Sequence, residues 1–286
     1  RAGVSAREPP RLRFARGRAK SAAMTRLPFI KMHGLGNDFV VVDRRAGGPT
    51  LDAAAVRAVA DRRTGVGCDQ LVVLEPSTRA DVHMRIFNPD ASEAGACGNA
   101  TRCVAALLGG DVTVETTAGL LPCRAVDGDI EVDMGPVRTA WDAIPLAEPD
   151  DDTARVDLAV GPLTGPACCN VGNPHATFFV LDVDAVDLAD LGPRIEHHPR
   201  FPERVNVGVC AVEAADRLRL RVWERGAGLT RACGSGACAA LVGAVRRGLA
   251  ERRATVQLDG GPLVITWRED DGHVTMRGPA TRVFDG

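Results

Sequence analysis

The chain has 286 residues, of which 45% are apolar and 25% charged, a profile typical of a globular protein with a sizeable core. Its formal net charge of -2 comes without a sustained basic stripe, so the sequence lacks the electrostatic footprint of a nucleic-acid or anionic-membrane partner. No apolar run reaches the roughly 18 residues that a membrane span requires. We therefore expect a small-molecule partner.

Nine cysteines are an odd number in a chain too long to need disulfide staples. They indicate free thiols in a reducing compartment, and we expect a cytoplasmic protein. None of them has the CxxC spacing of a zinc site, so no metal site is predicted.

The elements follow a regular order along the chain. Residues 1–26 are rich in arginine and lack the apolar core of a signal peptide, so we expect a disordered or non-native extension. A capped helical pattern covers residues 50–63, and a short apolar helix follows Cys97. Two prolines and an acidic cluster in residues 141–153 predict a linker. Apolar runs predict short strands at 29–34, 39–43, 70–75 and 82–87, and three more before residue 136.

Beyond the linker, the same order of elements recurs at an offset of 136 residues, the separation of Cys97 and Cys233. The offset also carries Asn37 onto Asn173 and Gln70 onto Asn206 without a gap. An ordered series of this kind indicates an internal duplication, with halves at residues 27–140 and 154–284.

The duplicated pattern predicts an α+β fold. In each half, a strongly curved and mostly antiparallel sheet or barrel surrounds a central helix, because a helix that is apolar all round has no solvent face. Two halves related by a pseudo-twofold axis would bring the two helix N-termini together across a cleft, where ligand pockets commonly form. Cys97 and Cys233 would then face each other.

A facing cysteine pair permits proton transfer at a carbon acid. Backbone N–H groups at a helix N-terminus favour a thiolate and can bind a carboxylate. A thiolate on one side of the carbon and a thiol on the other would make a two-base racemase or epimerase that needs no cofactor in principle. Two other interpretations stay open for Cys97 and Cys233: buried packing residues, as expected for Cys103 and Cys238, and a disulfide.

Polar residues at matched positions could form a substrate clamp. An isolated loop asparagine is most often a turn former, and Glu224 with Arg225 could be a solvated ion pair. Read as a site, Arg225 would bind a carboxylate through two hydrogen bonds. His175 lies close to this set, although a lone histidine is more often structural.

The sequence resembles the diaminopimelate epimerase family from about residue 29 to 278. The resemblance rests on "KMHGLGNDFVVVD", "GCDQLVVLE", "RIFNPDASEAGACGNATRC", "GNPH", "FPERVNVGV" and "ERGAGLTRACGSGACA", in this order. It implies a cofactor-independent epimerase that interconverts LL- and meso-diaminopimelate for lysine and peptidoglycan precursor synthesis, with Cys97 and Cys233 as the acid/base pair. It also leaves room for a homodimer.

The resemblance assigns further roles by motif. His175 and Glu224 would help to set the protonation states of the cysteines. Backbone amides would clamp the reacting carboxylate at Gly98, Asn99, Gly234 and Ser235. Substrate would be held by Asn37, Gln70, Asn88, Asn173, Asn206, Glu224 and Arg225, the last four mainly at the unreacted centre.

Three positions depart from the family pattern, and two other functions remain as alternatives. Leu229 stands where a glutamate is usual, although its repeat partner Glu93 is present, and Ala91 and Ala100 stand where glycine is usual. The two alanines are tolerable if their φ angles are negative. A proline racemase-like enzyme also uses two cysteines, and a non-catalytic module could use the cysteines as a redox switch.

Overall fold

A computed structural model describes residues 27–286, so the predicted extension at residues 1–26 lies outside the described part of the chain. The elements of the first half are β1 (Ile30–Gly34), β2 (Asn37–Asp43), α1 (Ala53–Ala60), β3 (Gln70–Glu75), β4 (Val82–Phe87), β5 (Glu93–Ala94), α2 (Gly98–Leu107), β6 (Val112–Thr116), β7 (Gly119–Val126) and β8 (Asp129–Pro136).

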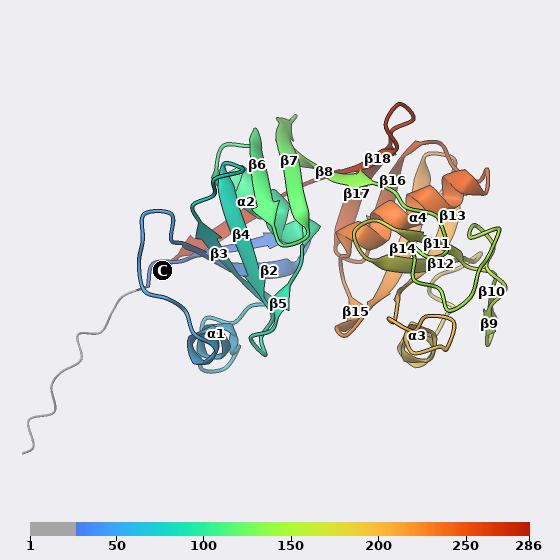
Figure 1. The fold of residues 1–286 in the computed structure, drawn as a ribbon, viewed down its shortest axis with the longest axis horizontal. Coiled ribbons are helices and arrows are strands. Elements are labelled where there is room, and N and C mark those ends of the chain that lie inside the picture. Colours follow the sequence, from blue (N-terminus) through green and yellow to red (C-terminus); the bar gives the residue numbers. More distant parts are fainter. Residues whose placement is uncertain (1–26) are drawn as a thin grey trace, which may run out of the picture.

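The second half repeats this order after a connecting segment (Figure 1). Its elements are β9 (Ala159–Val160), β10 (Leu163–Thr164), β11 (Ala167–Asn170), β12 (Pro174–Phe179), α3 (Leu188–Glu196), β13 (Asn206–Ala214), β14 (Arg217–Glu224), β15 (Gly228–Thr230), α4 (Gly234–Arg246), β16 (Arg253–Leu258), β17 (Gly261–Trp267), β18 (His273–Gly278) and β19 (Thr281–Asp285).

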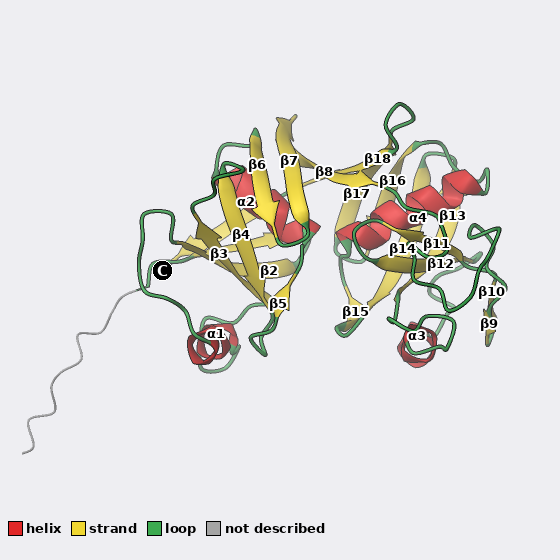
Figure 2. Ribbon diagram, in the orientation of Figure 1, coloured by secondary structure: helices red, strands yellow, loops and turns green. Residues whose placement is uncertain are grey.

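The strand pairings confirm the predicted duplication. β1 pairs antiparallel with β2 as β11 does with β12, and β2 pairs parallel with β3 as β12 does with β13. The same parallel step joins β4 to β6 and β14 to β16. Seventeen strands belong to one continuous sheet, which curls in each half around a helix without closing into a barrel (Figure 2). The predicted α+β class is confirmed.

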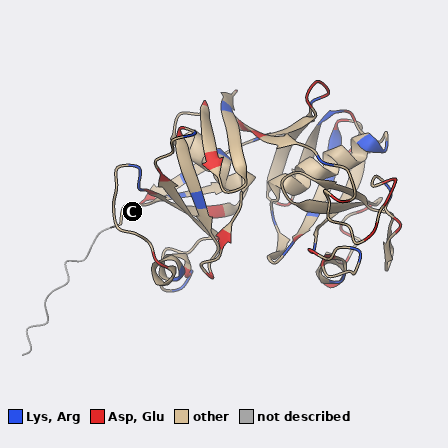
Figure 3. Ribbon diagram, viewed as in Figure 1, with Lys and Arg blue, Asp and Glu red and all other residues tan. Residues whose placement is uncertain are grey.

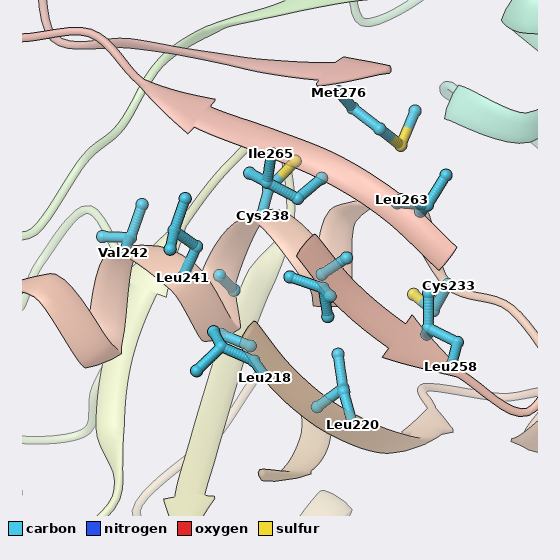
Figure 4. Packing of buried hydrophobic residues seen from close by; sticks show 14 of the residues in the cluster. Leu218, Leu220, Cys233, Cys238, Leu241, Val242, Leu258, Leu263, Ile265 and Met276 are labelled. Atoms are coloured by element: carbon cyan, nitrogen blue, oxygen red, sulfur yellow. The ribbon is translucent and has the colours of Figure 1, made fainter. Parts of the chain in front are cut away.

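The two central helices are buried, as their composition predicts. Every residue of α2 from Gly98 to Ala105 is buried, and the buried face of α4 runs from Gly234 to Ala244 with Ser235 half-buried. In the second half, α4 packs on Leu218, Leu263 and Ile265 of the surrounding strands (Figure 4). Small residues allow this close packing, because the sheet must approach the helix from several sides.

Helix α1 is shorter than the predicted helix over residues 50–63. Asp52 caps its first turn by accepting a hydrogen bond from Ala55 N, at 2.8 Å. The helix ends at Ala60 because Asp61 adopts an extended conformation and its carboxylate accepts from the backbone of Arg63 and Thr64.

The chain segment at the end of each half pairs with the other half. β8 and β18 pair antiparallel where the halves meet, near the top of Figure 1. Beyond β18, strand β19 pairs with β1 of the first half. Arg138, which follows β8, makes the corresponding bridge to Asn170 of the second half. The last strand of the chain is therefore part of the first half's sheet.

The segment predicted as a linker packs against the second half. Ile144 and Leu146 are buried in an apolar cluster with Phe178 and Ile195.

Acidic and basic side chains are interspersed over both halves (Figure 3). Across residues 27–286, no helix has both the length and the apolar character that a membrane crossing requires.

Candidate active site

The two cysteines occupy the same position in the two halves. Cys97 is the N-cap residue of α2 and Cys233 is that of α4, both with extended backbone. The Cys233 sulfur accepts a hydrogen bond from Gly236 N at 3.4 Å and lies 3.6 Å from Ser235 Oγ. Cys97 is half-buried, and its thiol lies 3.9 Å from Asn37 Oδ1.

Both thiols are held in the neutral form. Burial raises the pKa of Cys97 to about 11, against hydrogen bonds from backbone N–H groups that lower it, and the charge of Glu224 raises it further. Burial also raises the pKa of Cys233 well above its ordinary value, and Glu224 again adds to the increase. The N–H groups at the helix N-termini therefore lower the thiol pKa values, as expected, but burial raises these values by more.

The helix N-termini meet at the contact between the halves. Asn99, in the first turn of α2, donates from Nδ2 to the backbone oxygen of Ala232 at 3.1 Å, directly before Cys233. A Cβ on Gly98 would come within 2.5 Å of Met276 Cε, and a Cβ on Gly234 within 2.5 Å of Met276 Sδ. Both glycines therefore face the same methionine of β18.

The first half contributes three amide side chains. Asn37 begins β2 and Gln70 begins β3, and Gln70 Nε2 donates to Asn88 Oδ1 at 3.0 Å. Asn37 Oδ1 accepts from Asn99 Nδ2 at 3.1 Å. The structure thus brings Asn37 and Asn99 to Cys97, and pairs Gln70 of β3 with Asn88, which directly follows β4.

The second half contributes a more deeply buried polar group. His175 Nε2 lies 2.9 Å from Asn173 Oδ1, and burial lowers the pKa of His175 to about 3. Asn206 donates to the backbone oxygen of Pro174 and accepts from Arg225 N, both at 2.9 Å. The Arg225 guanidinium donates to a backbone oxygen, that of Glu203, at 2.9 Å.

Glu224 is an acidic group whose charge acts on both cysteines. It accepts from Thr230 Oγ1 at 2.5 Å, and burial raises its pKa. Its charge raises the pKa of the thiols of both halves. Among residues 27–286, no three His, Cys, Asp or Glu side chains are gathered to hold a metal ion.

Three residues of this region were not found from the sequence: Asp69, Thr230 and Met276. The 136-residue offset places Val205 and Ala94 opposite Asp69 and Thr230, and alignment of the two GP turns places Asp133 opposite Met276. None of the three therefore has a partner of the same residue type. For Asp69, the only signal was its place beside Gln70 in "CDQ".

The departures from the family pattern have different outcomes. Leu229 is 45% exposed on β15, whereas its counterpart Glu93 forms an ion pair with Arg85 at 2.8 Å. Ala100 lies in the helical turn of α2. Ala91 has a φ of 72°, so the negative φ that would make alanine tolerable here is not found.

The duplicated fold of this chain is also found in solved structures. A probable proline racemase from Agrobacterium radiobacter K84 superposes with a TM-score of 0.66 at 18% identity, covering 91% of this chain and 92% of that one. A hydroxyproline epimerase from Agrobacterium vitis gives 0.65 at 16% identity, covering 91% of each. These similarities concern the fold alone.

Sequence comparisons are more specific. The family model described as Diaminopimelate epimerase matches residues 29–140 and 167–283. Proteins named diaminopimelate epimerase from Acidiphilium cryptum (strain JF-5) and Rhodospirillum centenum (strain ATCC 51521 / SW) are 58% and 59% identical over 266 residues. The first alignment covers 91% of this chain and 95% of the relative, the second 90% and 91%. The chain belongs to the diaminopimelate epimerase family.

Proposed function

We propose that the protein interconverts LL- and meso-diaminopimelate by a two-base proton transfer between Cys97 and Cys233, in the synthesis of lysine and peptidoglycan precursors. One observation carries the proposal: two cysteines cap the matched buried helices, and Asn99 joins the N-terminal turns of these helices across the contact between the halves. Family membership supports the substrate.

In this mechanism, one cysteine, as a thiolate, takes the α-proton from the reacting carbon, and the thiol of the other cysteine delivers a proton to the opposite face. The protonation states of the pair are exchanged after each turnover. First-turn amides of Gly98, Asn99, Gly234 and Ser235 would hold the reacting carboxylate, where negative charge develops. The same site works in both directions with the roles reversed, and the residues themselves supply the acid and the base.

The neutral resting thiols set an energetic requirement. Deprotonating a thiol with a pKa of about 11 at pH 7 costs about 5 kcal/mol. Glu224 would accept the proton of Cys233, since its carboxylate acts on the pKa of this thiol. The ammonium group of a bound amino acid would lower a thiol pKa by its positive charge, so substrate binding itself would help to form the thiolate.

The distal part of the substrate would be held by the remaining polar residues. Asn173, Asn206, Glu224 and Arg225 lie on or beside β12 to β14, where the register pairs His175 with Asn206. Arg225 would exchange its contact with Glu203 O for the distal carboxylate. Asn37, Gln70 and Asn88 would line the side formed by the first half, and His175 would stay neutral.

The test measures epimerisation of LL-diaminopimelate in deuterated water, with α-deuterium incorporation followed by mass spectrometry. Wild-type protein in reductant should incorporate deuterium, and Cys97→Ala and Cys233→Ala should each abolish turnover. Cys103→Ala and Cys238→Ala, on the same helices, serve as matched controls and should stay within about tenfold of wild type, since buried cysteines act as small apolar residues. Undiminished exchange in either N-cap variant would refute the mechanism, and turnover of L-proline instead would favour the racemase alternative.

We place this activity in the cytoplasm, because the nine cysteines are all free, as a reducing compartment maintains them.

A homodimer is also part of the proposal. Sedimentation velocity at micromolar concentration tests it, and a single monomeric species would contradict it.

A further inference from the structure

A chain of hydrogen bonds runs from the edge of β3 to Cys97. Asp69 Oδ2 accepts from Asn37 Nδ2 at 2.9 Å and from Asp38 N at 3.1 Å. Because a carboxylate only accepts hydrogen bonds, Asn37 must turn its NH2 group toward Asp69. Its Oδ1 then faces the other way, where it accepts from Asn99 Nδ2 at 3.1 Å and lies 3.9 Å from the Cys97 sulfur.

The Asn99 end of this series of hydrogen bonds also fixes which groups donate and which accept. Asn99 Nδ2 also donates to the backbone oxygen of Ala232, which can only accept. Asn99 is 3% exposed, so solvent does not compete for its buried contact with Ala232. If the Asn37 amide turned over, NH2 would face NH2 at Asn99, and oxygen would face carboxylate at Asp69.

Asp69 is itself fixed by an ion network. Arg62 Nη2 lies 2.6 Å from Asp69 Oδ1 and 2.6 Å from Asp38 Oδ1. The backbone N–H of Asp69 donates to Asp38 Oδ1 at 3.0 Å, and Lys31 pairs with Asp38 Oδ2 at 2.5 Å. Two cations therefore hold two carboxylates at the start of the parallel pair β2 and β3.

This network has no equivalent in the second half. The repeat offset carries Asp38, Arg62 and Asp69 onto Pro174, His198 and Val205. There, Asn173 meets His175 instead of a carboxylate. The surroundings of the two otherwise matched cysteines therefore differ in the group that orients the neighbouring asparagine.

We propose that Asp69 is a positioning residue of the first half, which orients the Asn37 amide so that its oxygen faces the Cys97 thiol. The inference rests on the proposed function, because the thiol matters only if it exchanges a proton with substrate. Asp69 acts through Asn37, without touching the reacting atoms.

The first experiment compares wild type with Asp69→Asn. The new amide can donate or accept, so Asn99 alone still orients Asn37, and the Asn37 NH2 group can face the sulfur more often, which favours the thiolate. Loss of a negative charge acts in the same direction. The other ionisable groups facing Cys97 are Glu224, Arg102 and Cys103. Of these, Glu224 also responds to the charge of Asp69, which raises its pKa.

We expect the pH dependence of Cys97 alkylation by iodoacetamide, followed by peptide mass spectrometry, to move at least about 0.5 unit lower in Asp69→Asn. We also expect kcat to fall at least tenfold. Glu75→Gln is the matched control, because Glu75 ends the same strand and pairs with Arg44 at 2.9 Å. It should match wild type in both measurements. An unchanged alkylation profile in Asp69→Asn would overturn the proposal.

A double-mutant cycle with Asn37→Ala separates positioning from a general structural effect. If Asp69 acts through Asn37, then Asp69→Asn should cause less than a twofold further loss in the Asn37→Ala background. Additive losses would overturn the proposal. Asp69→Ala, which removes charge and acceptor together, gives the same readouts if Asp69→Asn does not fold. Alkylation does not require turnover, so a wild-type protein without epimerase activity would refute the proposed function while leaving this inference testable.

Discussion

Among single residues, Ala91 has an unfavourable backbone conformation beside a candidate site residue. Its φ of 72° lies in the left-handed region, where a non-glycine residue costs roughly 1–2 kcal/mol. The turn is fixed by Ala91 N donating to Asn88 O at 2.8 Å and by Asn88 N donating to Ser92 O at 2.9 Å. Ala91→Gly should therefore stabilise the protein by about 0.5–1 kcal/mol in urea unfolding, after the extra entropy of glycine is subtracted.

Ala100→Gly is the matched control for this prediction. Ala100 also stands where the family usually has glycine, but it lies in the buried first turns of α2. The same substitution should cost about 1 kcal/mol there, because glycine is a poor helix former. If both variants changed the free energy of unfolding in the same direction, strain at Ala91 would not be the cause.

Individual residues of the site could be predicted only where the same residue type recurs at the repeat offset. Cys97 and Cys233 were found because they match at the repeat offset, and the structure puts both at helix N-caps. Their catalytic role stays a prediction. Asp69 and Thr230 have no matching partner, and their contacts depend on side-chain directions set by strand register, which the sequence alone does not show.

At the scale of elements, the hairpin between β1 and β2 joins the halves. Leu35 and Gly36 form its two-residue turn with φ of 57° and 85°, the signs that a type I′ turn requires at both positions. Leu35 is 8% exposed and packs in the core around α4, in the other half of the molecule. Burial of this side chain therefore offsets the strain of its backbone.

Substitution of Leu35 separates burial from strain. Leu35→Ala removes most of the buried side chain and keeps the strain, so we expect it to cost about 2–3 kcal/mol. Leu35→Gly loses the same contacts but relieves the strain, so it should be at least as stable as Leu35→Ala in urea unfolding. If Leu35→Gly were about 1 kcal/mol less stable, as at an ordinary position, the strain would be absent.

At the scale of the whole molecule, the pairing of each half's end segment with the other half was not predictable. The repeat predicts which segments form strands, but β19 could pair with either half by its pattern alone. Its pairing with β1 follows from the antiparallel contact of β8 with β18, which directs each chain end toward the opposite half. The order of elements was thus available from the sequence, whereas the path of the chain between the halves required the structure.

Global stability should fall in mild acid because of His175. Burial holds the pKa of its imidazole at about 3, against an ordinary value of 6.5, so the unfolded state binds a proton that the folded state refuses. The stabilisation is complete above pH 6.5 and is lost as the pH falls toward 3. Between pH 6.5 and 4.5, His175 should account for about 2 kcal/mol of lost stability. Urea unfolding at the two pH values measures this loss, and His175→Asn should remove it, whereas the exposed His197→Asn should behave like wild type. An equal loss in wild type and His175→Asn would mean that this imidazole does not control acid stability.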